Sequence, residues 1–328
     1  MLYRHAMIYF YCPDDNQPNG GVEKIYRQAD VLNRHGIAAA VVHLAEGFRC
    51  RWFRNDTPVV YARTVRPLEE DFIVAAEVFG PDIARTAPGI RKVIFNQNCY
   101  NTFRHYPLDT KPGETPYLHP DVAATITVSE DSLRYLAYAF PGARVLRIRP
   151  GIDSSLFHPG TPKKRQIAFM PRRQLEEARQ VFNILKFRGC LPGFEIAEIS
   201  GMSHEEAAQV LRESAFFFSF SAIEGFGLPP AEAMASGCIT IGFHGRGGRE
   251  FFRPEFSWPI EFGDIETYAR TAEMLLAGYR GAPRPLAEKA LEAARFIAAH
   301  YSLGQEEADI LDCWRQIMAS GASSPGRN

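Results

Sequence analysis

The feature that most constrains this sequence is a glycine- and proline-rich turn between two strongly apolar runs. The run at residues 216–220 is followed by residues 221–237, SAIEGFGLPPAEAMASG, and then by a second β-rich run at residues 238–243. Apolar runs of this kind predict buried strands, and the small residues between Pro229 and Gly237 predict a short helix. The segment is therefore expected to fold as strand, loop, helix and strand.

The turn has the features of an anion-binding site. Proline is tolerated at the first helical position, where no backbone donor is needed, so Pro229 and Pro230 are expected to mark the start of the helix. The two glycines before them let the backbone approach a ligand closely, and the positive end of the helix dipole favours a phosphate. We therefore expect this part of the loop to bind a phosphate: Gly225, Phe226, Gly227 and Leu228.

Two carboxylates flank the turn. Glu224 ends the first predicted strand, and Glu232 falls one turn inside the predicted helix. Carboxylates do not bind phosphate, but they accept hydrogen bonds from hydroxyl groups. A ligand with phosphate in the middle and hydroxyls at both ends satisfies both features, and this describes a nucleotide-diphosphate sugar. An ordinary strand, loop and helix with solvated glutamates is the alternative.

The Glu-x7-Glu spacing from Glu224 to Glu232, followed by Ala-Met-Ala-Ser-Gly, resembles the donor-site signature of the retaining GT-B glycosyltransferases of family 4 type. The resemblance implies an α/β protein with two Rossmann-like domains facing across a cleft. It also implies transfer of a sugar from a nucleotide-diphosphate donor, with retention at the anomeric carbon and with neither a metal nor another cofactor. In that mechanism Glu224 fixes the hydroxyls of the donor sugar, and Glu232 binds the ribose hydroxyls.

Length and composition agree with this expectation. A chain of 328 residues is long enough for two domains with separate cores, and a hydrophobic content of 46% is typical of a soluble globular protein. The net charge of −1 provides no global field that would attract nucleic acid. Six scattered cysteines without a C-x-x-C pair indicate reduced thiols and argue against a structural zinc site. With neither a bilayer-spanning run nor a secretory signal, we expect a cytoplasmic protein, with the inner face of the membrane left open as a location.

The first half of the chain alternates predicted strands with predicted helices, which is typical of a parallel sheet. Predicted strands occupy residues 6–12, 37–44, 72–79, 91–98 and 123–128. Between the first two lie a polar loop, residues 13–21, and a helix, residues 22–34, so the chain opens with a βαβ unit. Ser129 is expected to cap the helix that follows the last of these strands.

Two segments of this half are candidates for ligand contact. Gly20 and Gly21 resemble the Gly-Gly-x-Glu segment with which the same glycosyltransferases touch the donor phosphate or the acceptor. Polar residues also follow the strand at residues 91–98, and ligands of open parallel sheets bind beyond the carboxyl ends of the strands. We therefore expect acceptor contacts from Gln97, Asn98 and Tyr100. A strand-end turn satisfied by its own side-chain amides is the alternative.

The domain boundary is predicted near the middle of the chain. Residues 149–157 resemble the passage that ends the N-terminal domain in this family, and residues 159–165 are rich in proline, glycine and charge, as in a linker. We expect an acceptor-side domain at residues 1–160, completed by a C-terminal helix at residues 305–318. Residues 161–304 are expected to form the donor-binding domain.

Positive charge for the diphosphate is expected after the first strand of the second domain. Members of the family usually carry an arginine there and a lysine a few positions later. This chain has Arg172 and Arg173, but the lysine region is Leu-Glu-Glu-Ala-Arg, ending at Arg179. Guanidinium groups match the geometry of phosphate oxygens. The resemblance therefore implies that Arg173 first and Arg172 second neutralise the leaving diphosphate, with Arg179 as an alternative.

A second glycine-rich stretch follows the strand after the turn. Residues 242–250, GFHGRGGRE, do not have the spacing of a dinucleotide-binding fingerprint, so we expect a mobile loop that faces the ligand.

The sequence leaves the donor base, the sugar and the acceptor open. The expected partners are a nucleotide-diphosphate sugar and a carbohydrate or lipid-linked acceptor, without nucleic acid and with peripheral membrane association left open. Passages similar to bacterial surface-polysaccharide transferases favour a role in polysaccharide biosynthesis. Two alternatives remain: a nucleotide-sugar epimerase or a phosphorylase of the same fold, and a non-catalytic protein that binds a nucleotide or sugar.

Overall fold

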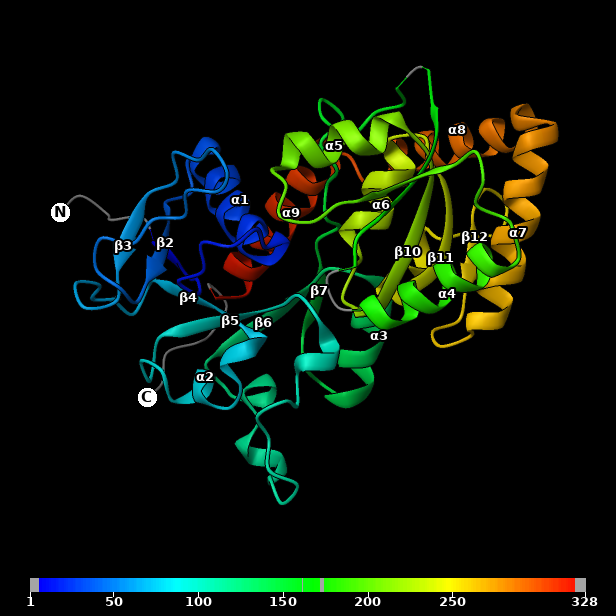
Figure 1. Cartoon of the computed structure of the whole chain (residues 1–328). Coiled ribbons are helices and arrows are strands. Elements are labelled where there is room, and N and C mark those ends of the chain that lie inside the picture. The colour runs from blue at the N-terminus through cyan, green and yellow to red at the C-terminus, as the bar shows by residue number, and fades with distance from the viewer. Residues whose placement is uncertain (1–5, 161, 172–173, 322–328) are drawn as a thin grey trace. The chain divides into compact units, whose positions relative to one another are not determined.

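The computed structural model describes residues 6–160, 162–171 and 174–321, and the chain forms two compact units (Figure 1). Unit 1 consists of Met1–Arg149 and Glu306–Asn328, and unit 2 consists of Pro150–Gln305. Each unit contains one sheet in which every pair of neighbouring strands is parallel. The predicted fold class, two α/β domains with parallel sheets, is confirmed.

Unit 1 has a seven-stranded sheet with the order β3-β2-β1-β4-β5-β6-β7. Its strands are β1 (Ile8–Tyr11), β2 (Ala39–His43), β3 (Val59–Tyr61), β4 (Phe72–Ala76), β5 (Arg91–Asn96), β6 (Val122–Thr127) and β7 (Val145–Arg147). The central strands are almost completely buried, which explains their continuous apolar runs. The strand order reverses between β1 and β4, so the carboxyl ends of these two strands mark the place where such sheets bind ligands.

The helices of unit 1 cover this sheet. They are α1 (Gly20–Arg34), α2 (Asp82–Arg85), α3 (Glu130–Ala139) and α9 (Leu303–Gly321), with short 3₁₀ turns η1 (Glu77–Phe79), η2 (Cys99–Asn101), η3 (Pro112–Glu114) and η4 (Pro116–Leu118). Trp314 of α9 is fully buried and packs edge-on against Phe10 and Phe72, with ring centroids 5.9 and 5.8 Å away. Lys24 of α1 forms an ion pair of 2.8 Å with Glu306 of α9. The last helix is thereby fastened to both the sheet and the first helix.

The first helix begins two residues earlier than the sequence indicated. Asn19 is its cap, because the side-chain oxygen accepts a hydrogen bond of 3.0 Å from the backbone N–H of Gly21. Gly20 and Gly21, which we expected in the loop, are therefore the first two residues of α1. A well-placed asparagine compensates for the poor helix propensity of the two glycines.

Unit 2 has a five-stranded sheet with the order β12-β11-β10-β8-β9. Its strands are β8 (Lys164–Phe169), β9 (Glu195–Glu198), β10 (Ser214–Glu224), β11 (Ile239–Arg246) and β12 (Trp258–Ile260). Its helices are α4 (Leu175–Phe187), α5 (His204–Glu213), α6 (Leu228–Ala235), α7 (Ile265–Gly281) and α8 (Pro283–His300), and η5 (Gly247–Glu250) is a 3₁₀ turn. Figure 1 shows α4 and α7 on one face of this sheet and α5 and α6 on the other. The strand order reverses between β8 and β10.

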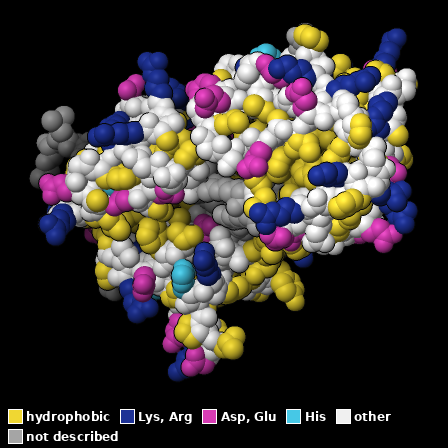
Figure 2. Space-filling model, viewed as in Figure 1, with side chains coloured by type: hydrophobic (Ala, Val, Ile, Leu, Met, Phe, Trp, Pro, Cys, Tyr) yellow, Lys and Arg dark blue, Asp and Glu magenta, His cyan; other side chains and the backbone are white. Residues whose placement is uncertain are grey.

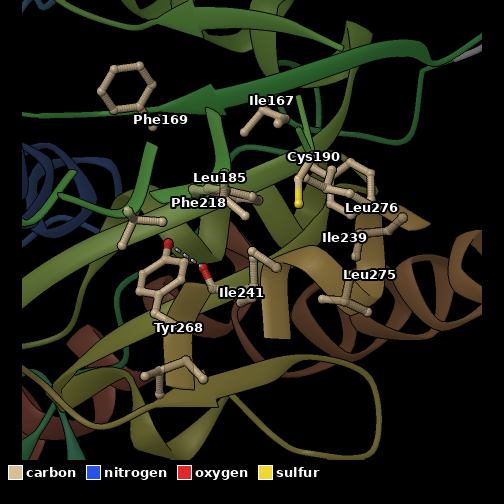
Figure 3. Close-up of a cluster of buried hydrophobic side chains, with 14 of the residues drawn as sticks. Ile167, Phe169, Leu185, Cys190, Phe218, Ile239, Ile241, Tyr268, Leu275 and Leu276 are labelled. Atoms are coloured by element: carbon tan, nitrogen blue, oxygen red, sulfur yellow. Dashed lines mark hydrogen bonds between the residues drawn. The ribbon is translucent and has the colours of Figure 1, made fainter. Parts of the chain in front are cut away.

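The core of unit 2 is built around the aromatic residues of β10. Phe182 of α4 stacks on Phe218 with ring centroids 5.7 Å apart, and Tyr268 of α7 stacks on Phe220 at 5.1 Å. The buried hydroxyl of Tyr268 finds a partner in the carbonyl oxygen of Ile241 at 3.3 Å (Figure 3). α4 and α7 thus pack along one face of β10, which gives the loop at its end a firm base.

The units divide after Arg149, whereas the sequence placed the boundary after residue 160. The difference arises because the intervening segment is bonded to unit 2. The N–H of Ile152 donates to the carbonyl oxygen of Tyr301 at 2.7 Å. The amine of Lys163 donates to backbone carbonyls at the ends of α5 and α6, at 3.1 and 2.7 Å.

Among the helices of the described residues, none combines the length and the apolar character that crossing a bilayer requires.

Candidate functional site

The glycine- and proline-bearing turn lies at the carboxyl end of β10, beside the reversal of strand order in unit 2. Glu224 is the last residue of the strand and is half-buried. Gly227 has φ 94° and ψ 67°, a left-handed conformation that glycine adopts without strain, and α6 begins at Leu228. The helix therefore starts one residue before the prolines that were expected to open it.

The backbone of this loop is held in place by the packing of its side chains. Pro229 and Pro230 carry no N–H, so the donors closest to the helix start belong to the residues up to Leu228. The ring of Phe226 is buried and packs against Phe251 and Tyr301, with centroid distances of 5.0 and 5.3 Å. Anchoring the side chain in the core holds the main chain in place, which is the arrangement that an anion-binding turn needs.

The stretch at residues 242–250 is not the mobile loop that we expected. β11 continues to Arg246, which lies opposite Glu224 in the strand register, and η5 follows. A Cβ atom at Gly247 would lie 2.2 Å from the carbonyl oxygen of Gly225. Because these glycines have no side chain, the stretch packs directly against the loop after β10. This packing fixes the conformation of the stretch.

Arg246 introduces backbone strain next to this loop. Its φ of 65° and ψ of −63° are those of a γ-turn and are costly for a residue with a side chain. Its N–H donates to Nδ1 of His244 at 3.0 Å, which assigns the ring proton to Nε2. Nε2 lies 3.4 Å from a carboxylate oxygen of Glu261, and burial lowers the pKa of His244. A neutral, buried histidine thus supports the strained turn.

Glu232 lies inside α6 with 7% of its surface exposed. Nε2 of His204 lies 3.5 Å from Oε1 of Glu232. The ring of His204 also meets Phe157 edge-on, with centroids 5.4 Å apart. The sequence gives no sign that His204 lies beside Glu232, because a serine followed by a histidine and two glutamates indicates only a capped helix start, which this segment also is. Only the packing of α5 against α6 reveals its proximity to Glu232.

An open pocket of about 610 Å³ lies at the carboxyl ends of β8 and β9, beside α4. On the face of the molecule shown in Figure 2, hydrophobic side chains gather next to α4 with basic side chains beside them. The pocket combines aromatic and aliphatic walls with polar groups: Phe169, Phe182, Ile196, Arg179, Asn183 and Glu198. Its size and mixed lining suit a small organic ligand.

The predicted basic pair lies outside the described residues. Arg172 and Arg173 follow Pro171, which lines the pocket, but their own positions are not described, so their role stays a prediction. Arg179 is described: it forms an ion pair with Glu176, three residues earlier on α4, and it also lines the pocket. Within the described part of the chain, no three His, Cys, Asp or Glu side chains gather in a way that could hold a metal ion.

In unit 1 the predicted acceptor residues and the glycine pair lie together. Nε2 of Gln97 donates to the carbonyl oxygen of Gly21 at 3.1 Å, which joins the end of β5 to the start of α1. Asn98 caps η2 by accepting a bond of 3.2 Å from the N–H of Tyr100. The hydroxyl of Tyr100 donates to Asp131 at 2.6 Å. These side chains therefore form an ordered turn, with the side-chain capping that we considered as the alternative.

Behind this turn lies Glu77, to which the sequence analysis assigned no role. It is the first residue of η1, directly after β4, and only 4% of its surface is exposed. Its Oε2 accepts a hydrogen bond of 3.0 Å from the backbone N–H of Gln97. Burial raises the pKa of Glu77 to about 7, although hydrogen bonds from Gln97, Asn98 and Asn101 act in the opposite direction.

Comparison with known proteins concerns the part of unit 2 that contains the loop after β10. Residues 196–295 match the family model described as "Glycosyl transferases group 1". Most of unit 2 is therefore similar to a glycosyltransferase domain. The matched segment contains Glu224, the glycine-bearing loop, Glu232 and His204.

A curated relative is similar to part of the chain. It is an alpha-1,6-glucosyltransferase of Actinobacillus pleuropneumoniae serotype 7 (strain AP76), 41% identical over 85 residues. The similar segment spans 24% of this chain and 24% of the relative, so it reaches about a quarter of the relative's length.

Solved structures resemble the chain over nearly its whole length. Sucrose-phosphate synthase from Thermosynechococcus elongatus has a TM-score of 0.70 at 13% identity, covering 96% of this chain and 100% of that one. HepE of Anabaena, in complex with UDP and glucose, has a TM-score of 0.68 at 14% identity, covering 95% and 100%. These likenesses show the GT-B fold. With the family match they support a glycosyltransferase, a transferase of class EC 2.4.

Proposed function

We propose that the protein transfers a glucosyl or related hexosyl group from a UDP-sugar to a carbohydrate or lipid-linked acceptor, with retention of the anomeric configuration. The observation that carries this proposal is the loop between Glu224 and Glu232, which leads through the left-handed Gly227 into the start of α6 between two carboxylates and lies within the glycosyltransferase match. The choice of UDP and glucose draws on two proteins: the relative named as a glucosyltransferase, and HepE in complex with UDP and glucose.

In this proposal unit 2 binds the donor. The N–H groups of residues 225–228 and the start of α6 receive the diphosphate, since an anion is favoured at a helix N-terminus. Glu232 accepts hydrogen bonds from the ribose hydroxyls, and Glu224 accepts them from the donor sugar. The base of the nucleotide binds in the pocket beside α4, at the ends of β8 and β9, where it packs against Phe169 and Phe182. Arg173 and Arg172 supply the positive charge.

The chemistry follows from these contacts. As the acceptor oxygen bonds to the anomeric carbon, the bond from that carbon to the diphosphate oxygen breaks and negative charge develops on the leaving group. Fixed N–H donors and arginines stabilise this charge without reorganising. The acceptor's proton moves to the departing diphosphate oxygen, so attack occurs on the same face and the configuration is retained. This route needs neither a protein nucleophile nor a metal ion.

Unit 1 serves the acceptor side in this proposal. Gly20 and Gly21, with Gln97, Asn98 and Tyr100, form the ordered turn at the carboxyl ends of the strands, where amide and hydroxyl groups suit the hydroxyls of a sugar. We further propose that the protein works in the cytoplasm, at the inner face of the membrane, in the assembly of a surface polysaccharide.

The test is release of UDP from UDP-glucose, measured with and without a panel of oligosaccharide and lipid-extract acceptors. Glu224→Gln is expected to lower acceptor-dependent release about 100-fold while the affinity for UDP stays unchanged. Glu232→Gln is expected to weaken UDP binding about tenfold. Glu255→Gln, which changes an exposed glutamate of the same unit, serves as the matched control and should change neither quantity.

Other outcomes separate the alternatives. Tight UDP binding without turnover on any acceptor would favour a non-catalytic binding protein. Conversion of UDP-glucose to an epimer would favour an epimerase. Full activity in both the Glu224 and Glu232 variants would show that this loop is not the donor site.

A further inference from the structure

Glu77 has no part in the proposed chemistry, yet it stands at a decisive place in unit 1. It directly follows β4, one of the two strands between which the strand order reverses. A carboxylate that is 4% exposed is costly unless several hydrogen bonds stabilise it. Its carboxylate accepts hydrogen bonds from neutral donors: the backbone N–H groups of Gln97, Asn98 and Glu77 itself, and the side-chain amide of Asn101. One buried group thereby holds successive residues of the turn after β5.

The contacts continue from this turn to the first helix. Gln97 is bonded at both ends, because its N–H donates to Glu77 at 3.0 Å and its side-chain Nε2 donates to the carbonyl oxygen of Gly21 at 3.1 Å. The fit is tight: a Cβ atom at Gly21 would lie 3.2 Å from Oε1 of Gln97. The chain from Glu77 through Gln97 to Gly21 thus joins β4, β5 and α1 around the predicted ligand-binding edge.

We propose that Glu77 is the positioning residue of the acceptor-side turn: its ionised carboxylate sets the conformation in which Gln97 and Asn98 present their amides and in which Gln97 holds the glycine pair. What the turn binds rests on the proposed function. The positioning itself does not, and it is measurable in the protein without substrate.

The residue type matters for this role. A carboxylate is an acceptor only, so both of its oxygens can take N–H donors. A glutamine of the same shape has a single accepting oxygen and must turn its NH₂ group toward one of the donors that now face the carboxylate. A protonated glutamic acid has the same defect, with its O–H in place of the NH₂. Either change is therefore expected to loosen the turn.

Two of the titratable groups near Glu77 keep their charge in the same range, and a third, His105, lies against Gly80 at the end of η1, where a Cβ atom would be 3.2 Å from Cβ of His105. Cys99 on η2 and Tyr117 on η4 interact electrostatically with it. Burial raises the pKa of Cys99 to about 11 and raises that of Tyr117 further. Both are neutral between pH 6 and 8, whereas the pKa of Glu77 lies at about 7. Below neutral pH the protonated side chain stays buried, which favours the fold as a whole, but it offers fewer accepting positions to the N–H groups of the turn, so the turn should exchange its amide hydrogens faster there than above neutral pH.

The experiment uses the full chain with Glu77→Gln, Glu77→Asp and, as matched control, Glu69→Gln, which changes an exposed glutamate of the same unit. Amide hydrogen exchange at residues 97–101 is measured at pH 8, corrected for intrinsic rates. In Glu77→Gln the amide hydrogens of residues 97–101 are expected to exchange about tenfold faster than in the wild type. The increase should be smaller in Glu77→Asp and in Glu69→Gln. UDP-glucose turnover is measured from pH 5.5 to 8.5. The inflection near pH 7 in kcat/KM for the acceptor should disappear in Glu77→Gln, while UDP affinity stays constant.

The outcomes are separable. Unchanged exchange in Glu77→Gln, or a wild-type pH profile in that variant, overturns the positioning role. If the wild-type protein shows no turnover of UDP-glucose, the proposed function fails and the exchange measurement still decides the role of Glu77. If Glu77→Gln does not fold, amide hydrogen exchange at residues 97–101 of the wild type is compared at pH 6 and pH 8 instead. Equal exchange rates at the two pH values, after correction for intrinsic rates, contradict the proposal.

Discussion

Nε2 of His204, the first residue of α5, lies 3.5 Å from Oε1 of Glu232, which is almost fully buried in α6. At this distance the imidazole limits the orientations of the carboxylate, and the edge-on contact with Phe157 limits those of the imidazole. If Glu232 binds the ribose hydroxyls, His204 determines how its oxygens are presented. The histidine thus becomes a supporting residue of the proposed donor site.

Replacing this histidine should weaken nucleotide binding. His204→Ala leaves the Glu232 carboxylate without its imidazole neighbour, so we expect the Kd for UDP to rise about three- to tenfold, as for the loss of one hydrogen bond. Isothermal titration calorimetry measures the change. His158→Ala, which removes an exposed histidine of the same unit, is the control. Equal affinity in His204→Ala and the wild type would remove His204 from the site.

A second prediction concerns the glycine that backs the loop after β10. In Gly247→Ala the new Cβ would lie 2.2 Å from the carbonyl oxygen of Gly225, so the two segments must move apart. We expect a loss of about 1–3 kcal/mol in the free energy of unfolding, together with weaker UDP binding. Gly281→Ala is the matched control, because nothing lies within 4 Å of a Cβ there and alanine favours a helix. Urea unfolding curves that coincide for Gly247→Ala and the wild type would contradict the prediction.

Local patterns in the sequence were sufficient for the fold class. The apolar run at residues 37–44 predicted β2, and the shorter apolar stretch within residues 91–98 predicted β5, since strands buried on both faces need successive apolar side chains. Ser129 does cap α3, by accepting a bond from the N–H of Ser132. The short edge strands β3 and β12 were missed, because three residues carry little periodic signal and β12 contains Pro259.

The candidate site was predictable only where its chemistry is local. The conformational preferences of Gly227, Pro229 and Pro230 predict a turn that leads into a helix. The proximity of His204 to Glu232, and of Gly247 to Gly225, depends on packing between segments far apart in the chain. Glu77 was overlooked for a similar reason, since a single glutamate in an apolar run has no pattern of its own.

The segment that we took for a linker also leads to a prediction. Lys163 donates to carbonyl oxygens at the ends of α5 and α6, and its replacement by methionine would leave both acceptors buried without that partner. We expect Lys163→Met to lower the free energy of unfolding by about 1–3 kcal/mol. The neighbouring Lys164 forms an exposed ion pair with Glu213, so Lys164→Met should change stability little. Thermal unfolding of the two variants side by side is the measurement, and equal midpoints would exclude the capping role.

The last prediction is the pH dependence of stability that arises from Glu77. Its pKa is about 7 in the folded protein and 4.5 in the reference state, so folding favours the protonated form. The stability contributed by this group is fully present below pH 4.5 and is lost as the pH rises to about 7, because over that range the folded state binds more protons than the unfolded state. The shift corresponds to a loss of up to about 3 kcal/mol.

Glutamine does not titrate, so Glu77→Gln should remove this part of the pH dependence. Urea unfolding of the wild type and the variant at pH 5, 6, 7 and 8 gives the difference in their free energies of unfolding. That difference should move in favour of the variant as the pH rises to 7 and then stay constant. Glu69→Gln, at an exposed position, should follow the wild type throughout. A constant difference between Glu77→Gln and the wild type from pH 5 to 8 would mean that Glu77 does not take up its proton in this range, and the pH-dependent ordering of the turn would then have no source.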